Sequence, residues 1–362
     1  MRLRHTKETM SVPTTYNSIL TSVADNRKVP SSKFYSEYHG HLVEHLEILL
    51  PNLRATSDSL IWTAGDSSLD NKHWFEDTQP AVGAYMDVLS PPQSKCDVTY
   101  WLNYVAQERG VNRMAAINTA VEATTLNERS FRLREQDKFL RDNIREDDIL
   151  IVSIGGNDVA LAPTPCTIFN MLCLLKLPLQ WIENGCSCGT VPFDDKCFGC
   201  GPSLLSCFGS FPPFAGYFLH LFGPRIESYL RKLTEKTKPR TILVCMIYYP
   251  DQNPTPSWAN LALGALGYNA NPKKLQAMIR LVFQRAISTI RIPGTQVIPV
   301  PLFSVLDGTC SEDYVERVEP SALGGSKMAN FIWDIIMERK DPILSPISPS
   351  GAPPLTTMSD RE

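Results

Sequence analysis

The sequence predicts an α/β fold with a central parallel sheet of about five strands. Strand-like apolar runs alternate with helix-like segments over most of the 362 residues, a pattern typical of parallel sheets covered by helices on both faces. Two of these runs also end in similar polar turns, Gly65-Asp66-Ser67 and Gly155-Gly156-Asn157-Asp158. Sites in such folds form beyond the carboxyl ends of the strands, where these turns are expected to lie.

The expected strands are short apolar or β-branched runs: Leu60–Ala64, Val98–Leu102, Ile149–Ile154, Thr241–Tyr248 and Gln296–Val300. The expected helices are longer segments with helical spacing of apolar residues: Phe34–Leu50, Arg113–Thr124, Phe131–Arg145, Pro224–Thr237, Pro272–Arg291 and Ser326–Lys340. The first of these helices should end at Pro51, because proline interrupts the hydrogen bonds of a helix.

The chain divides into a lead-in with one helix (1–54), a main domain (55–340) and a tail rich in proline and serine (341–362). The polar start and the tail are expected to be disordered. Length and apolar content allow one large core. A net charge of −3 gives no electrostatic reason to expect nucleic acid as a partner. Neither a secretory signal nor a membrane-spanning segment is evident, which predicts a cytoplasmic protein.

A Cys-rich segment, 163–213, follows the second polar turn directly, and we expect it to form a cap over the site. It holds seven of the ten cysteines. The spacings within Cys186–Cys188 and Cys197–Cys200 suit a tetrahedral structural zinc site formed by these four residues. Disulfides or free thiols are the alternatives. The apolar residues of the cap suggest a hydrophobic acyl or alkyl group in the substrate: Ile168, Phe169, Leu172, Leu174, Leu175 and Trp181.

The two polar turns resemble conserved blocks of the SGNH (GDSL-like) hydrolase superfamily, and the resemblance covers about residues 55 to 340. The first block corresponds to 65–70, with Ser67 as the implied nucleophile and with Gly65, Asp66 and Asp70 in support. The third corresponds to 155–158, with the Asn157 amide as an implied oxyanion donor between Gly156 and Asp158. The resemblance implies a flavodoxin-like three-layer fold and hydrolysis of a carboxylic ester or related acyl bond, with no cofactor required.

The chain departs from the family in the other two blocks. In the second block, 118–125, Ala123 replaces the family glycine; its backbone N–H remains, but a positive φ there would strain alanine. In the last block, Pro-Ser and a glycine pair are present, but Glu319 stands in place of histidine and Glu316 in place of aspartate. We therefore expect the oxyanion donors to be Ser67, Ala123 and Asn157, with Glu319 as base and Glu316 as its partner.

The missing histidine matters because a serine nucleophile needs a base to accept its hydroxyl proton. Histidine has a suitable pKa, whereas a carboxylate with a pKa of about 4.3 is a weak base unless burial or nearby like charges raise it. His73, six residues after Ser67, is an alternative base. His220 lies among apolar residues and is expected to be a core residue. Oxyanion binding alone leaves roughly 10³–10⁴-fold catalysis, so a weak base predicts a slow enzyme.

Other interpretations stay open. Ser67 could cap a helix, Asn157 and Asp158 could close a turn, and Glu316 and Glu319 could be a solvated pair at a helix start. The chain as a whole could be an impaired member of the superfamily that binds a partner without catalysis. More remotely, His41-Leu-Val-Glu44-His45 matches the His-x-x-Glu-His pattern of zinc peptidases. The preferred substrate is a small ester or a lipid-like molecule.

Overall fold

A computed structural model describes residues 27–36, 38–183 and 215–338. The predicted lead-in and tail, and the four cysteines proposed for zinc, lie outside these ranges. The core is a five-stranded sheet in the order β6-β2-β7-β8-β9, and all its neighbouring strands are parallel. The strands are β2 (Ser59–Gly65), β6 (Met114–Asn118), β7 (Ile149–Ser153), β8 (Thr241–Met246) and β9 (Gln296–Pro301). The predicted α/β fold with a central five-stranded parallel sheet is confirmed.

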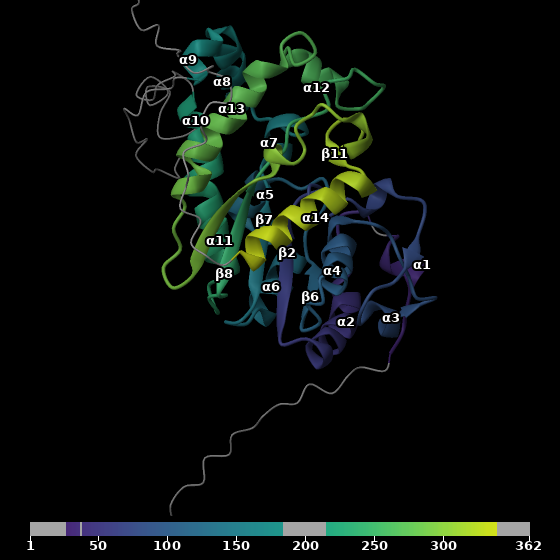
Figure 1. Cartoon of the computed structure of the whole chain (residues 1–362). Coiled ribbons are helices and arrows are strands. Elements are labelled where there is room, and N and C mark those ends of the chain that lie inside the picture. Colours follow the sequence, from purple (N-terminus) through teal and green to yellow (C-terminus); the bar gives the residue numbers. More distant parts are fainter. Residues whose placement is uncertain (1–26, 37, 184–214, 339–362) are drawn as a thin grey trace, which may run out of the picture.

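Helices cover both faces of this sheet (Figure 1). Alternate residues of each strand belong to two separate cores: Ile61 and Ile151 pack with α4 (Val98–Glu108) and α14 (Ala322–Met337) on one face. Leu60 and Trp62 pack on the other face. The helices of that second layer include α2 (Val43–Thr56), α6 (Glu135–Asn143), α11 (Ile226–Leu233) and α13 (Pro272–Arg285). The sheet is therefore the middle of three layers.

Shorter elements complete the described chain. The remaining helices are α1 (Ser31–Phe34), α3 (Tyr85–Val88), α5 (Leu126–Phe131), α7 (Gly156–Ala160), α8 (Pro165–Lys176), α9 (Leu179–Glu183), α10 (Ala215–His220) and α12 (Asn260–Ala265). Three two-stranded ladders pair β1 (Val29–Pro30) with β4 (Leu89–Ser90), β3 (Gln79–Pro80) with β5 (Gln93–Ser94), and β10 (Tyr314–Val315) with β11 (Glu319–Pro320). No helix of the described residues has the length and hydropathy needed to cross a bilayer.

In two segments the structure differs from the prediction: a predicted strand is a helix, and a predicted helix contains a strand. The segment predicted as the strand Val98–Leu102 begins α4, because the Asp97 side chain accepts the Tyr100 N–H and caps the helix. The segment predicted as the helix Arg113–Thr124 contains β6, the edge strand beside β2. Asn103 of α4 pairs with both backbone groups of Ala116, accepting its N–H at 2.8 Å and donating to its carbonyl at 3.1 Å. Tertiary pairing thus outweighs the helix propensity of the two alanines.

The N-terminal helix also differs from its prediction. It begins at Val43 rather than at Phe34, since His39 and Gly40 have φ values of 78° and 93° that no helix accommodates. It continues through Pro51 to Thr56. The other predicted helices and the four remaining strands lie where expected, with shifts at their ends.

Candidate active site

The turn that carries Ser67 depends on a glycine that no other residue could replace. Gly65 has a φ of 128°, and a Cβ at this position would lie 1.7 Å from the carbonyl oxygen of Ser153. The close approach lets Asp66 N–H donate to that same carbonyl at 3.0 Å. Leu69 and Asp70 then donate their N–H groups to the Asp66 carbonyl. Strand β2 therefore ends in a tight turn beside β7, with Ser67 at its start.

The Asp66 carboxylate joins this turn to the one that follows β7. One oxygen accepts the N–H and the hydroxyl of Ser68, and the other accepts the Gly155 N–H at 3.2 Å. Gly155 has a φ of 109°, and a Cβ there would meet the Phe222 ring at 2.8 Å. Burial raises the pKa of Asp66 to about 6 despite the hydrogen bonds from Ser68. The two polar turns predicted from the sequence thus form one connected structure.

Ser67 contacts the residue that replaces the family histidine. Its hydroxyl donates a hydrogen bond of 3.1 Å to Glu319 Oε1, across 252 residues of sequence. Glu319 is buried in the two-residue strand β11, and its backbone pairs with Val315 of β10. The short β10–β11 ladder therefore delivers a carboxylate to the serine, as the sequence predicted for this position.

The environment of Glu319 favours its neutral form. Burial raises the pKa of Glu319 to about 8, and the charges of Asp66 and Asp70 add to this effect, while the Ser67 hydroxyl opposes it. The second carboxylate oxygen, Oε2, is buried and has no hydrogen-bond partner among the described residues. Within the described residues, the carboxylate of the buried Glu319 therefore makes one hydrogen bond, to Ser67.

The three residues predicted as oxyanion donors, Ser67, Ala123 and Asn157, lie around one cavity. Within the described residues, the backbone N–H groups of Ser67 and Ala123 make no internal hydrogen bond. Ala123 has a φ of 55°, so this alanine bears the backbone strain that a glycine would avoid. The Asn157 amide donates to the Thr124 carbonyl at 3.0 Å, which fixes its orientation and leaves its second N–H available.

That cavity is polar on one side and has room for a small molecule. It contains about 580 Å³ of space, its open side included. Besides the residues already named, its walls are Tyr38, Trp74, Glu122, Leu161 and Trp258. The Ser67–Glu319 contact therefore lies at the surface of a cavity and not in a closed core.

A buried ion cluster supports the strained residue from behind. Lys72 Nζ lies 2.9 Å from Asp70 Oδ2 and 2.8 Å from Glu122 Oε2, and all three side chains are almost completely buried. Glu122 precedes Ala123, and its N–H donates to Asp70. Burial opposes ionisation of Asp70, but the Lys72 charge and the hydrogen bonds it receives outweigh burial and lower the pKa of Asp70. Sequence reasoning missed Lys72 and Glu122, because no motif marks them.

Arg129 was also missed, although it ties two of the blocks together. Its guanidinium donates to the Gly65 carbonyl at 2.9 Å and to the Thr124 hydroxyl at 2.6 Å. Asp137 neutralises its charge at 3.0 Å. Asp158, predicted as a supporting residue, also joins separate segments of the chain, because its carboxylate accepts the N–H groups of Leu126 and Asn127.

Glu316 is not the partner of Glu319, contrary to the sequence prediction. It lies in the tight turn between β10 and β11 with a φ of 52°, and its carboxylate accepts the Trp258 N–H at 2.9 Å. The Glu316 backbone carbonyl accepts the Ser257 hydroxyl at 2.6 Å, so the residue is bound to the 257–258 segment, whereas the Glu319 carboxylate bonds Ser67. The carboxylate pair expected from the spacing of the two residues is not formed.

Neither histidine considered from the sequence approaches Ser67. His73 is exposed, and its ring packs against Tyr38 and Trp74 at centroid distances of 4.8 and 5.3 Å. It lines no wall of the cavity that contains Ser67. His220 is buried in the apolar core, as predicted. Among the residues that the structure describes, Glu319 and no histidine lies against the serine.

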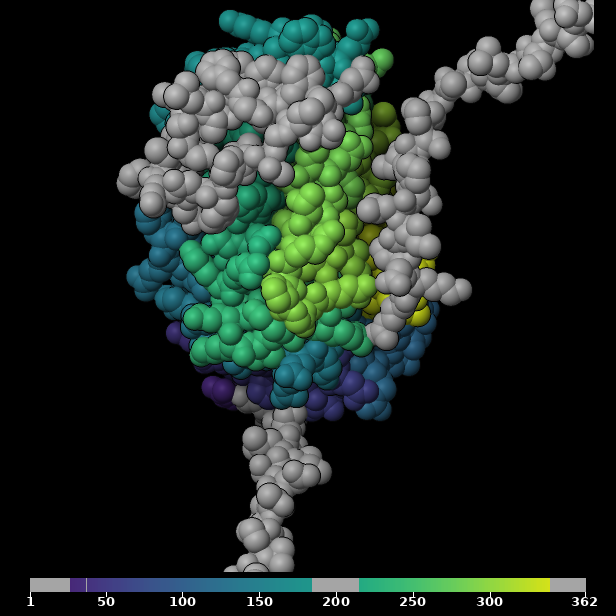
Figure 2. Space-filling model, turned by 90° about the vertical axis from the view of Figure 1, so that its left-hand side faces the viewer, coloured from purple at the N-terminus to yellow at the C-terminus, as the bar shows by residue number. Residues whose placement is uncertain are grey.

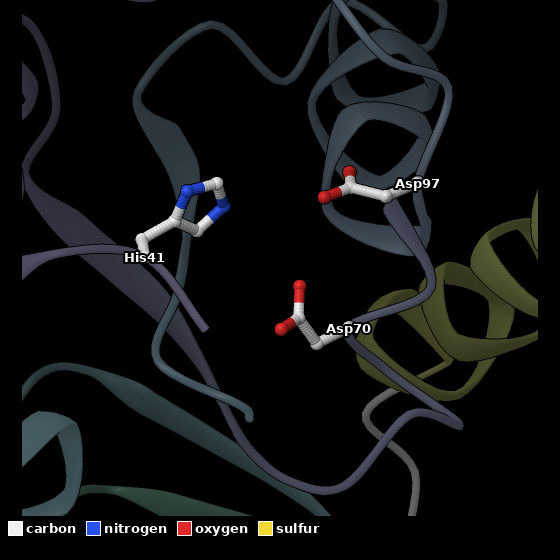
Figure 3. Close-up of side chains that lie close together, drawn as sticks. All are labelled: His41, Asp70 and Asp97. Carbon is white, nitrogen blue, oxygen red and sulfur yellow. The ribbon is translucent and has the colours of Figure 1, made fainter. Parts of the chain in front are cut away.

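The zinc-peptidase pattern is not assembled either. His41 precedes α2 and is buried, whereas Glu44 is exposed, so the two do not share a face. The His41 ring instead points with the carboxylates of Asp70 and Asp97 into a common space (Figure 3), their ligand atoms within 4.8 Å of one another. His41 Nδ1 bonds the Phe34 carbonyl at 2.8 Å, and Lys72 already supplies a positive charge to Asp70. These contacts indicate a buried polar cluster that Lys72 neutralises in part.

The predicted cap is described only in part. Its first portion forms α8 and α9, in which Leu174 is buried while Ile168, Phe169, Leu172 and Trp181 remain about half exposed. Cys166 forms a disulfide, and Cys173 carries a free thiol. The four cysteines proposed for a structural zinc site lie outside the described residues.

Comparisons with known proteins give structural likenesses only. No family model matches the chain, and no curated protein matches it. A GDSL-like lipase from Parabacteroides merdae is 13% identical, covering 77% of this chain and 95% of its own with a TM-score of 0.38. A lipase/acylhydrolase from Enterococcus faecalis is 12% identical, covering 78% and 96% with a TM-score of 0.39. An acetylxylan esterase from Geobacillus stearothermophilus is 14% identical, covering 78% and 95% with a TM-score of 0.40. Such values assign neither an activity nor a substrate to this chain.

Proposed function

We propose that this chain is an SGNH-type ester hydrolase in which Ser67 is the nucleophile and Glu319 the general base. The observation that carries the proposal is the 3.1 Å hydrogen bond from the Ser67 hydroxyl to Glu319 Oε1 at the wall of an open cavity. A nucleophile within hydrogen-bond reach of a base is the arrangement that acyl transfer through serine requires.

Each half of the reaction needs one proton to move twice. Ionised Glu319 accepts the Ser67 hydroxyl proton as Oγ attacks the ester carbonyl, and the resulting carboxylic acid returns it to the departing alkoxide. Glu319 then accepts a proton from water, whose oxygen attacks the acyl-serine, and finally returns that proton to Ser67 as the carboxylic acid product leaves. The carbonyl oxygen becomes an oxyanion in both halves and would be held by the N–H groups of Ser67, Ala123 and Asn157. Loss of one such donor typically costs about 2.7–4 kcal/mol.

The raised pKa of Glu319 decides how well it serves as a base. At a pKa of about 8, about one carboxyl in ten is ionised at pH 7, but each ionised group is a much stronger base than an ordinary glutamate. The same burial that makes Glu319 basic therefore limits the active fraction near neutrality. The enzyme should be slow at pH 7 and faster above pH 8.

The substrate that suits this site is a neutral ester. Glu122 and Glu319 line the cavity, and Asp66 lies directly behind Ser67. Catalysis requires ionised Glu319, and an anionic substrate would then meet this negative charge at short range, where salt screens it little. We therefore favour small neutral or lipid-like esters, and no step of the reaction requires a cofactor.

Labelling by a fluorophosphonate probe at pH 8.5 tests the proposal. Wild type should be labelled and should hydrolyse p-nitrophenyl acetate, and Ser67→Ala should abolish both. The matched control is Ser68→Ala, which removes a neighbouring hydroxyl bonded to Asp66 and Ser153 but leaves the dyad intact. Absence of both labelling and turnover in folded wild type at pH 8.5 would overturn the proposal.

A second candidate is a non-catalytic protein that binds esters or a partner on the same scaffold. The replacement of histidine by Glu319 and the largely neutral state of that residue at pH 7 favour it. This candidate predicts no labelling at any pH, whereas the hydrolase predicts labelling that grows with pH.

A further inference from the structure

A second, apolar hollow begins at the same serine. It shares Ser67, Asn157, Trp258 and Glu319 with the polar cavity but continues away from it between α7, α12 and α13. Its space is about 710 Å³, the open side included, and beyond the site its walls are mainly aliphatic, among them Val159, Leu263 and Ile279. Ser67 therefore lies at the junction of a polar cavity and an apolar one.

A third hollow extends the apolar one farther from the serine. The two share four wall residues, Val159, Ile247, Leu275 and Ile279. Every described side chain that lines this farther hollow is apolar, and its walls include Phe218, Phe222 and Met278. The sulfur of methionine adapts to irregular apolar ligands. The shared walls place a succession of apolar side chains between the site of Ser67 and the farther hollow.

Helix α13 forms one wall of both hollows. Leu275, Ile279 and Val282 follow one another at helical spacing along the wall, a distance of about 10 Å at 1.5 Å per residue. Because a C–C bond is about 1.5 Å long and the chain zigzags, an extended chain of roughly eight carbons covers that distance. The outer side of α13, in light green, runs along the face shown in Figure 2.

We propose that the two apolar hollows form the acyl site, so that the preferred substrates are esters of medium-chain fatty acids with a polar alcohol. The acyl chain would lie along α13, and the alcohol would face Tyr38 and Glu122 in the polar cavity. This proposal rests on the proposed hydrolase function for its chemistry. The occupant itself is defined by the walls: an unbranched alkyl chain fits them, and an acetyl group leaves most of them without contact.

A binding experiment tests the hollows without any hydrolysis. In Ser67→Ala, titration calorimetry should show 1-octanol binding more than tenfold tighter than 1-butanol, because each buried methylene is worth up to about fourfold in affinity. Met278→Trp should remove this preference by filling the farther hollow. The control is Gln284→Trp, which adds the same ring at an exposed position of the same helix and should leave the preference unchanged. Equal affinities for the two alcohols in Ser67→Ala would overturn the proposal.

Hydrolysis rates then show whether the alkyl chain bound in the hollows belongs to the acyl group or to the alcohol of the ester. Wild type should prefer p-nitrophenyl octanoate over the acetate by more than tenfold in kcat/KM and should show no such preference between octyl acetate and butyl acetate. The reverse result would place the alcohol chain in the hollow and contradict the acyl assignment. If Met278→Trp does not fold, Val282→Ala should shift the optimum to longer acyl chains, and an unchanged optimum would count against the proposal. Loss of all hydrolysis with octanol preference retained would refute the proposed function and leave the hollow intact.

Discussion

Lys72 Nζ lies 2.8 Å from Glu122 Oε2, directly behind the strained backbone of Ala123. Lys72 and Glu122 are both buried, and Asp70, whose pKa is lowered by the Lys72 charge, completes the cluster. Lys72→Met should leave two buried carboxylates without their cation and lower the free energy of unfolding by about 3–5 kcal/mol, the usual cost of breaking a buried ion pair. Chemical denaturation measures this.

Two further variants check that charge is the cause. Lys138→Met breaks the partly exposed pair with Glu135 and should cost less than about 1 kcal/mol. The triple change Lys72→Met, Asp70→Asn, Glu122→Gln leaves no ionisable group in the cluster and should recover part of the lost stability. If Lys72→Met lowered the free energy of unfolding only as much as Lys138→Met, the cluster would not be a stabilising unit.

The activity of the Ser67–Glu319 pair should depend on pH through the ionisation of Glu319. Since burial raises the pKa of Glu319 to about 8 and the ionised form is the base, kcat/KM should rise about tenfold per pH unit below 8 and level off above it. Glu319→Gln should abolish this rise. A flat profile between pH 6 and pH 9 would contradict the role of Glu319.

Replacement by the family histidine offers a complementary measurement. Glu319→His should increase kcat/KM at pH 7 and move the midpoint of the profile toward the imidazole pKa of about 6.5. The buried site has an open cavity beside it, which gives the ring space. Unchanged activity in a variant with the wild-type melting curve would indicate that proton transfer from Ser67 does not limit the rate.

The same raised pKa predicts how stability changes with pH. The folded state holds the Glu319 proton up to a pKa of about 8, whereas the unfolded chain releases it near 4.3. The contribution of Glu319 to the free energy of unfolding is therefore fully present below pH 4.3 and is lost as the pH rises toward 8. Glu319→Gln should have the wild-type Tm at pH 4.5 and a Tm several degrees higher at pH 8.5. Equal shifts at both pH values would point to a packing effect instead.

Ala123 provides a test of backbone strain. Its φ of 55° costs alanine about 1–2 kcal/mol, and glycine removes most of that cost while adding about 0.4–1 kcal/mol of chain entropy. Ala123→Gly should therefore raise the free energy of unfolding slightly and retain labelling at Ser67. Ala120→Gly, three residues earlier and without a positive φ, should lower it. Destabilisation of both by the same amount would exclude strain at Ala123.

Substitutions of Glu316 and of Glu319 should have clearly different effects on the labelling of Ser67. Glu316→Ala removes the contact with Trp258 N–H and should leave fluorophosphonate labelling of Ser67 near the wild-type rate. Glu319→Ala should reduce it at least a hundredfold, within the usual contribution of a general base. Equal losses in the two variants would restore Glu316 to the reaction.

The sequence predicted the parts of this site that lie where a strand ends. Ser67 and Asn157 follow apolar runs, so parallel strands bring them to the same edge whatever happens elsewhere. Glu319 was found only through the Pro-Ser frame around it. The partner of Glu316 could not be predicted, because a positive φ in the hairpin turn decides its direction. The sequence analysis predicted β6 as a helix and α4 as a strand. Their structures depend on tertiary contacts, above all those of Asn103 with Ala116.

The carboxylate at position 319 also changes the charge of the transition state. An imidazole that accepts the serine proton becomes a cation, and this cation attracts the oxyanion that forms a few ångströms away. Glu319 becomes neutral instead, so the negative charge only moves from one oxygen to another within the site. The N–H donors of Ser67, Ala123 and Asn157 would then carry the whole electrostatic stabilisation. Permanently anionic tetrahedral inhibitors should consequently bind this protein most weakly. Neutral inhibitors that become anionic only when they react with Ser67 should bind most tightly.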